Sequence, residues 1–212
     1  MKIAVIGATG RVGPEIVAEA LRRGHDVTAI ARDPSKIAPQ PHLETAKANI
    51  QDAGEAARAI KGHDAVISAY NPGWTNPNIR ADIVKGFTGL IAGAKQAGVK
   101  RVLFIGGAGS LVENGSRLVD GPDFHPDWKA GALGAADALE IVRKETDLDW
   151  SFLSPAVMLN DGVRTAKYRH GKEAPVRDHK GESNISVPDL AHAILDEIEQ
   201  PKHIRQRFTV GY

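Results

Sequence analysis

The sequence contains no cysteine, which excludes disulfides, thiolate metal sites, iron–sulfur clusters and a cysteine nucleophile. It also lacks a charge bias, since 27 basic and 26 acidic residues leave a formal net charge of +1. This balance gives no reason to expect nucleic acid or a membrane as a partner. No segment has the roughly eighteen apolar residues of a membrane helix, and the apolar run Ile3–Ile6 is too short for a secretory signal. We therefore expect a cytoplasmic protein that is mature from Met1.

Two further absences narrow the chemistry. The eight histidines are scattered, with no His-x-His or His-Glu-x-x-His spacing, so we expect no metal site. The sequence also has no Gly-x-Ser-x-Gly motif, which argues against a hydrolase that carries its serine on a strand-to-helix turn.

The sequence does contain short β-rich runs that alternate with longer helical patterns, which is typical of a parallel sheet with crossover helices. Strands are expected at Ile3–Ile6, Val27–Ala31, Leu43–Lys47, 64–69, Val102–Ile105, Trp150–Ser154 and Arg207–Val210. Helices are expected at 12–21, 52–61, 79–94, 129–146 and 187–198, the last with Ser186 and Asp189 as a capping pair. Residues 157–185 are polar, and we interpret them as substrate-side loops with at most a short hairpin. We expect a single domain over 1–212.

The strongest chemical signal is the glycine motif after the first strand, Gly7-Ala8-Thr9-Gly10-Arg11-Val12-Gly13. This spacing, placed between a buried strand and an amphipathic helix, is typical of dinucleotide binding. Glycines let the backbone turn tightly and admit a pyrophosphate, and the helix offers it free N–H groups and a positive dipole end. We therefore expect an α/β, Rossmann-type doubly wound parallel sheet with helices on both faces, which binds NADP(H) or NAD(H).

The end of the second strand bears on the choice of cofactor. It reads Ala31-Arg32-Asp33, about where an acidic residue binds the ribose of NAD or an arginine binds the 2′-phosphate of NADP. The guanidinium of Arg32 suits a phosphate, which favours NADP(H), while Asp33 keeps NAD(H) open. The alternative is that Arg32 is a solvated residue that pairs with Asp33.

These residues resemble a known family. The glycine motif and the run Gly24-His25-Asp26-Val27-Thr28-Ala29-Ile30-Ala31-Arg32-Asp33-Pro34 are similar to atypical short-chain dehydrogenases/reductases. That NAD(P)H-binding group includes NmrA-like proteins and the flavin-reductase branch of biliverdin reductase. The runs 149–155, 186–191 and 207–210 are similar to bacterial proteins of the NADH-flavin reductase type.

The resemblance implies further cofactor contacts. It places Asn49 and Ile50 beside the adenine, and Ser68, Ala69 and Tyr70 along the nicotinamide ribose. Ser154 and Pro155 are implied near the nicotinamide. For Ser68 the alternative is a core hydroxyl without a ligand.

The sequence departs from the superfamily at its usual catalytic pair, Tyr-x-x-x-Lys. Trp128 or Lys129 stands at the tyrosine position and Ala132 or Leu133 at the lysine position. Standard acid–base chemistry on an alcohol or carbonyl is therefore not expected. Ser110 matches the usual serine, and we predict that Ser110 and Lys129 orient the substrate. The alternatives are turn chemistry for Ser110 and an ordinary helix lysine for Lys129.

Three functions fit these residues. The first is an NAD(P)H-dependent reductase that passes hydride to a flavin, a quinone or a similar flat aromatic acceptor, which can draw its proton from solvent. The second is a non-enzymatic NADP(H) sensor of the NmrA-like type. The third, an epimerase or reductase for a nucleotide sugar or a flavonoid-like alcohol, lacks the expected catalytic pair. Trp74 and Trp128 are candidate walls for a substrate, with core packing as the alternative.

Overall fold

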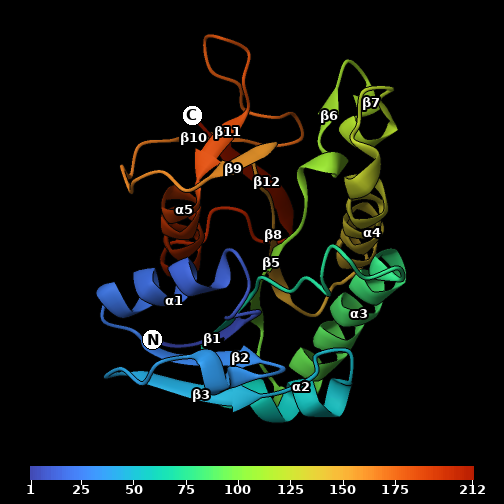
Figure 1. Ribbon diagram of the computed structural model, residues 1–212. Coiled ribbons are helices and arrows are strands. Elements are labelled where there is room, and N and C mark those ends of the chain that lie inside the picture. Colours follow the sequence, from blue (N-terminus) through green and yellow to red (C-terminus); the bar gives the residue numbers. More distant parts are fainter.

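A computed structural model describes all 212 residues of the chain. Its centre is an eight-stranded sheet in the order β10-β12-β8-β5-β4-β1-β2-β3 (Figure 1). The strands of this sheet are β1 (Lys2–Ile6), β2 (Asp26–Ala31), β3 (Leu43–Lys47), β4 (Ala65–Ser68), β5 (Arg101–Ile105), β8 (Asp149–Ser154), β10 (Arg169–Gly171) and β12 (Gln206–Gly211). Neighbouring strands are parallel throughout, except that the edge strand β10 runs antiparallel to β12.

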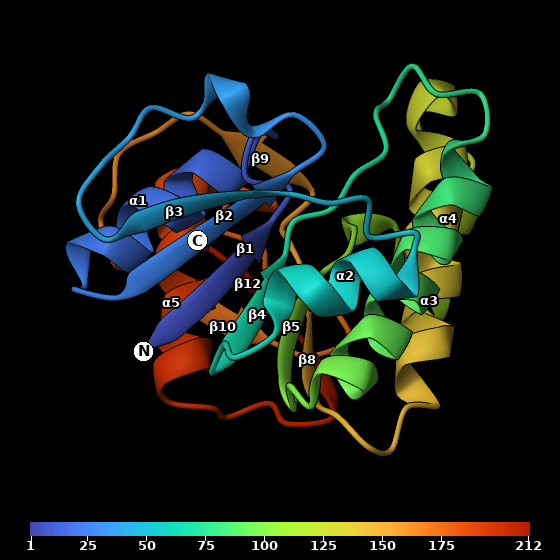
Figure 2. The same ribbon diagram turned by 90° about the horizontal axis from the view of Figure 1, so that it is seen from below.

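Two layers of helices enclose this sheet (Figure 2). The helices are α1 (Gly13–Arg22), α2 (Ala53–Ile60), α3 (Ile79–Ala97), α4 (Pro126–Arg143) and α5 (Val187–Glu199). Helices α1 and α5 pack on one face of the sheet, and α2, α3 and α4 pack on the other. The predicted α/β fold, a doubly wound sheet with helices on both faces, is confirmed. None of the helices is both long and apolar enough to cross a membrane.

The sequence pattern explains these layers. In β1 the residues Ile3 to Ile6 are almost completely buried, because they are apolar on both faces of a central strand. Side chains alternate between the two cores, so Ile3 joins the layer of α1 and α5, and Ala4 joins the layer of α2, α3 and α4. Helix α5 begins as predicted, with the Ser186 hydroxyl accepting a hydrogen bond from the Asp189 N–H at 3.1 Å.

The strand order reverses direction between β1 and β4, which places a topological switch point beside the glycine motif. The chain leaves β1 toward β2 and β3, then crosses to β4, β5 and β8 on the other side. Ligands of open α/β sheets bind at the carboxyl ends of the strands near such a point. The site described below lies at this end, which we call the carboxyl edge of the sheet.

The substrate-side segment 157–185 differs from the prediction. No hairpin forms within it; its short strands β9 (Met158–Asn160) and β11 (Asn184–Ser186) pair in parallel, and β10 joins the main sheet. A short hairpin that the sequence did not reveal, β6 (Val112–Glu113) with β7 (Ser116–Arg117), follows β5 instead. The fourth long helix begins at Pro126 and ends at Arg143, three residues earlier at each end than the predicted 129–146.

Candidate dinucleotide-binding site

The glycine turn joins the ends of β1 and β4 closely. Gly7 adopts a φ of 76°, and a Cβ at this position would lie 2.4 Å from the carbonyl oxygen of Ala69. Only glycine fits there, because any side chain would collide with the backbone that follows β4. The close approach brings Gly7, Ala69 and the start of α1 together at the carboxyl edge.

The backbone of this turn has unused hydrogen-bond donors. The N–H groups of Thr9, Arg11 and Val12 donate no hydrogen bond within the chain, and no side chain caps α1 at Val12. A Cβ on Gly10 would touch only the Gly7 carbonyl oxygen, at 3.2 Å, and would otherwise occupy open space. Free donors at a helix N-terminus, beside a position that a side chain would fill, suit a pyrophosphate. The residues present therefore fit a dinucleotide.

At the end of β2 the two candidate residues have separate roles. The carboxylate of Asp33 accepts hydrogen bonds from the Ser35 hydroxyl at 2.6 Å and from its N–H at 3.1 Å. These bonds lower the pKa of Asp33 and commit it to the turn at Pro34–Lys36. Arg32 is exposed and is not paired with Asp33, contrary to the alternative considered above. Its guanidinium is therefore available to a ligand.

The residues predicted beside the adenine follow β3. Asn49 forms a local turn in which its side-chain oxygen accepts a hydrogen bond from the Gln51 N–H at 3.2 Å. Its own N–H donates to the carboxylate of Glu55 at 2.8 Å, in the first turn of α2. Ile50 is 3% exposed, so its side chain belongs to the core and only its backbone is near the surface.

Ser68, the last residue of β4, is buried, and Ala69 and Tyr70 after it are partly buried. Ser68 is 1% exposed and its hydroxyl has no hydrogen-bond partner, so the structure leaves both of its interpretations open. The Tyr70 hydroxyl accepts a hydrogen bond from Gln51 at 2.9 Å, and a Cβ on Gly86 would overlap its ring. Burial raises the pKa of Tyr70, which makes it a poor proton donor near neutral pH.

Ser110, in the turn Ala108–Ser110 that follows β5, meets Ser154 at the end of β8. Their hydroxyl oxygens lie 3.3 Å apart, and Ser110 also donates to the Gly107 carbonyl at 3.2 Å. Ser110 is 4% exposed, and Ser154 is fully buried. The following Pro155 is also buried. The third member of this group is Arg207 of β12, whose Nη1 lies 3.3 Å from the Ser110 oxygen. Sequence reasoning missed Arg207, because nothing in a strand pattern shows which side chain reaches a neighbouring strand's end.

The first turn of α4 contains Trp128 and Lys129, which stand where the Tyr-x-x-x-Lys pattern would have its tyrosine. Lys129 is exposed there, and Trp128 is 47% exposed beside His125, with their ring centres 4.8 Å apart. Trp74, in the loop after β4, is 58% exposed and lies against Gly131, where a Cβ would come within 2.7 Å of the indole. Neither tryptophan is a core residue, so core packing does not account for them.

Arg11 links the glycine turn to the substrate-side segment. Its guanidinium donates to the Leu159 carbonyl at 2.9 Å and to the carboxylate of Asp161 at 3.2 Å. A second tie joins Arg164 of the same segment to Glu19 of α1, at 3.0 Å. The segment is therefore attached both to the glycine turn and to α1, a relationship that the sequence did not reveal.

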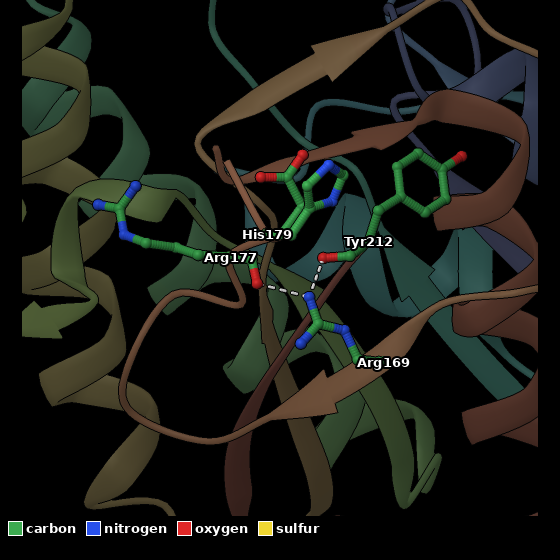
Figure 3. A pocket seen from close by; sticks show the side chains of 5 residues that line it. Arg169, Arg177, His179 and Tyr212 are labelled. Atoms are coloured by element: carbon green, nitrogen blue, oxygen red, sulfur yellow. Dashed lines mark hydrogen bonds between the residues drawn. The ribbon is translucent and has the colours of Figure 1, made fainter. Parts of the chain in front are cut away.

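A separate hollow of about 660 Å³ opens beside the edge strand β10. It is lined by Arg169, Arg177, Asp178, His179 and Tyr212. Figure 3 shows that one nitrogen of Arg169 donates to the main-chain oxygens of Arg177 and Tyr212. Arg177 in turn pairs with Glu113 at 2.6 Å. Both guanidinium groups are engaged in holding the chain, so we assign no ligand to this hollow. No three His, Asp or Glu side chains gather closely enough to hold a metal ion.

Comparison with known proteins agrees with the geometry of the glycine turn. Residues 7–201 match a family model described as NAD(P)H-binding. The uncharacterized protein YwnB of Bacillus subtilis is 39% identical, over 99% of this chain and 98% of its own. A "putative epimerase" of Bacteroides thetaiotaomicron has a TM-score of 0.93 at 43% identity, covering 100% of this chain and 96% of its own. A "putative NADH-flavin reductase" of Streptococcus pneumoniae has a TM-score of 0.87 at 35% identity, covering 100% and 99%.

Proposed function

Because the chain belongs to the NAD(P)H-binding family, we propose that it is a reductase that passes hydride to a flavin, a quinone or a similar flat acceptor. The observation that carries the proposal is a glycine turn with free donors, in a chain that exposes tryptophans after β4 and at the start of α4 and lacks a Tyr-x-x-x-Lys pair. NAD(P)H, when bound, supplies the hydride. The chain's own residues bind the cofactor and orient the acceptor.

The cofactor would lie along residues that follow β1, β2, β3, β4 and β8. The turn Gly7–Gly13 holds the pyrophosphate, and Asn49 and Ile50 flank the adenine. Arg32 binds the 2′-phosphate, so NADP(H) is favoured over NAD(H). The nicotinamide half lies along the set Ser68, Ala69, Tyr70, Ser154 and Pro155.

The acceptor would lie between apolar side chains at the carboxyl edge. Trp74 and Trp128 are half-exposed, and Met158 of β9 is 53% exposed. Flat rings stack on such side chains with little loss of conformational entropy. Ser110 orients a ring oxygen, and Lys129 provides a positive charge near it. Because the acceptor's ring is electron-poor, its proton can come from water, and no tyrosine acid is needed.

A second candidate is the non-enzymatic NADP(H) sensor. The observation that favours it is the burial of Ser110 and Ser154, which leaves few polar groups for chemistry. In that case the two ties to residues 159–164, one from the glycine turn and one from α1, would transmit the bound state to a partner. An epimerase acting on an alcohol is disfavoured, because the tyrosine and lysine positions hold Trp128 or Lys129 and Ala132 or Leu133.

The deciding experiment measures oxidation of NADPH and NADH by the purified chain, with FMN and with a small benzoquinone as acceptors. Turnover with either acceptor supports the reductase. Firm, oxidation-state-selective binding of NADP(H) without turnover would replace it with the sensor. Turnover only with a sugar nucleotide or an alcohol would overturn both.

A further inference from the structure

A positive charge is buried directly behind the two serines. The side chain of Arg207 is 1% exposed, and its Nη1 lies 3.3 Å from the Ser110 oxygen and 3.5 Å from the Ser154 oxygen. Ser154 ends β8, and Ser110 lies in the short turn Ala108–Ser110 that follows β5 at the carboxyl edge, where the nicotinamide and the acceptor are expected. A neutral side chain could have satisfied two hydroxyls at far lower desolvation cost than a guanidinium.

The guanidinium divides its donors between two sides. Nε and Nη2 face the carboxylate of Glu173, and Nη1 faces the serines. Glu173 itself is 55% exposed and shares its charge with Arg143 at 3.1 Å. The negative charge is therefore in contact with solvent and is shared with Arg143, whereas the side chain that carries the positive charge is 1% exposed. Around the serines the balance of charge is positive.

The hydrogen bonds also determine where the two serine protons go. Arg207 has only donors, so both serine oxygens must accept from it. Ser110 gives its own proton to the Gly107 carbonyl, at 3.2 Å. The Ser154 proton can go to Ser110 in the free protein, which lets the Ser110 proton turn outward when an acceptor oxygen arrives.

We propose that Arg207 is a positioning residue that, through Ser110 and Ser154, makes a subsite for a ring oxygen that becomes negative. The proposal rests on the reductase function given above. As hydride adds to the acceptor ring, the acceptor gains two electrons and the charge collects on its carbonyl oxygen. A proton from water then completes the hydroquinone, and the nicotinamide is left oxidised. Arg207 favours the charged oxygen over the neutral carbonyl, which is how a site accelerates the transfer.

The test uses 4-nitrophenol, a flat phenol that titrates near neutral pH and whose phenolate is followed by its colour. The probe is bound to the wild-type chain saturated with NADP⁺, and its pKa in the complex is measured. We expect the subsite to lower the probe's pKa by about one unit. Arg207→Gln should abolish the lowering, and Arg207→Lys should keep most of it.

Glu173→Gln is the matched control, because it removes the counter-charge and leaves Arg207 in place. We expect it to lower the probe's pKa further, opposite in sign to Arg207→Gln. An ion pair with only a structural role would give no change in the probe's pKa with either variant. Melting temperature and NADP⁺ affinity report whether each variant is folded. If Arg207→Gln does not fold, the probe's pKa in Glu173→Gln decides the test.

The outcomes separate this proposal from the reductase function. The role of Arg207 is overturned if the probe does not bind, or if its bound pKa is the same in wild type, Arg207→Gln and Glu173→Gln. Quinone turnover can still be seen in that case, so the reductase function would stand. An Arg207-dependent pKa shift without turnover of any acceptor supports the subsite and overturns the reductase.

Discussion

Gly13 lies against the backbone of Gly7, so closely that a Cβ on Gly13 would stand 2.1 Å from the Gly7 carbonyl oxygen. This contact seats the first turn of α1 on the end of β1. Gly10, between them, has no comparable neighbour apart from the same oxygen at 3.2 Å. The glycines of one motif therefore differ in their surroundings: Gly7 and Gly13 permit close backbone contacts, and Gly10 borders the open space where we expect a phosphate.

Gly10→Val should remove dinucleotide binding from a chain that still folds. The new side chain would occupy the approach of the pyrophosphate and cost at least two charge-assisted hydrogen bonds, about 3 kcal/mol of binding free energy. Calorimetric titration with NADPH measures the loss, and circular dichroism checks the fold. Gly13→Val is the contrasting variant and should unfold or aggregate. Unchanged NADPH affinity in folded Gly10→Val would mean that the turn does not bind phosphates.

Arg32→Ala should weaken NADPH binding by about 1–3 kcal/mol and leave NADH binding nearly unchanged, because only NADPH carries the 2′-phosphate. Asp33→Ala serves as the control, since Asp33 holds the Ser35 turn and not Arg32. It should affect both cofactors alike. If Arg32→Ala weakens both equally, or neither, the preference for NADP(H) is wrong.

The parts of the molecule that the sequence predicted are those set by local pattern. The glycine turn, the buried strands and the Ser186 cap depend on residues within a few positions of one another, so their spacing carries the information. The doubly wound parallel sheet followed from the alternation of strands and helices, although its strand order was not predicted. The sequence could not decide whether Ser68 contacts a ligand or is a core hydroxyl, because burial of a hydroxyl depends on neighbouring strands.

The contacts that the sequence did not predict join distant parts of the chain. Arg207 is 97 positions from Ser110, and Arg11 is 150 positions from Asp161. No periodicity marks such pairs, because each depends on the register of the sheet and on where a loop returns. The cofactor contacts, those of the glycine turn included, the acceptor and the cytoplasmic location remain predictions.

Glu19 should make stability depend on pH in the acid range. Burial raises its pKa, but hydrogen bonds from Arg164, Arg22 and Arg23 outweigh this and lower the pKa to about 2, from an ordinary 4.5. A carboxylate with a lowered pKa stabilises the fold above its unfolded pKa, and the stabilisation is lost as pH falls from about 4.5 to about 2. Since two of the arginines are partly exposed, we expect Glu19→Gln to cost about 2 kcal/mol at neutral pH.

Urea unfolding at pH 7 and at low pH measures this contribution. The difference between wild type and Glu19→Gln should be present at pH 7 and should shrink as the pH approaches 2. Glu15→Gln, at an exposed position on the same helix, is the control and should change stability little. A difference between wild type and Glu19→Gln that does not depend on pH would contradict the assignment.

Trp74→Ala should raise the KM for a quinone or flavin about five- to tenfold, the scale of a lost stacking contact, without changing NADPH affinity. Trp74→Phe keeps a flat ring and should retain most of the activity. Steady-state kinetics with both acceptors measures the effect. An effect on NADPH binding, or none on the acceptor, would place the acceptor elsewhere.

Ser110→Ala and Lys129→Ala should each lower the rate of NADPH oxidation modestly, by about 10-fold to 100-fold, because they loosen the orientation of the acceptor. In a flavin or quinone reductase no single side chain is an obligatory proton donor, and the site has no free tyrosine to serve as one. A true general acid would cost about 10² to 10⁴ in rate and leave its own pKa in the pH–rate profile. The measurement is NADPH oxidation with FMN and with a benzoquinone across pH, for wild type and both variants. A loss beyond about a thousandfold, with a pH break that disappears in the variant, would instead establish acid–base chemistry on a carbonyl.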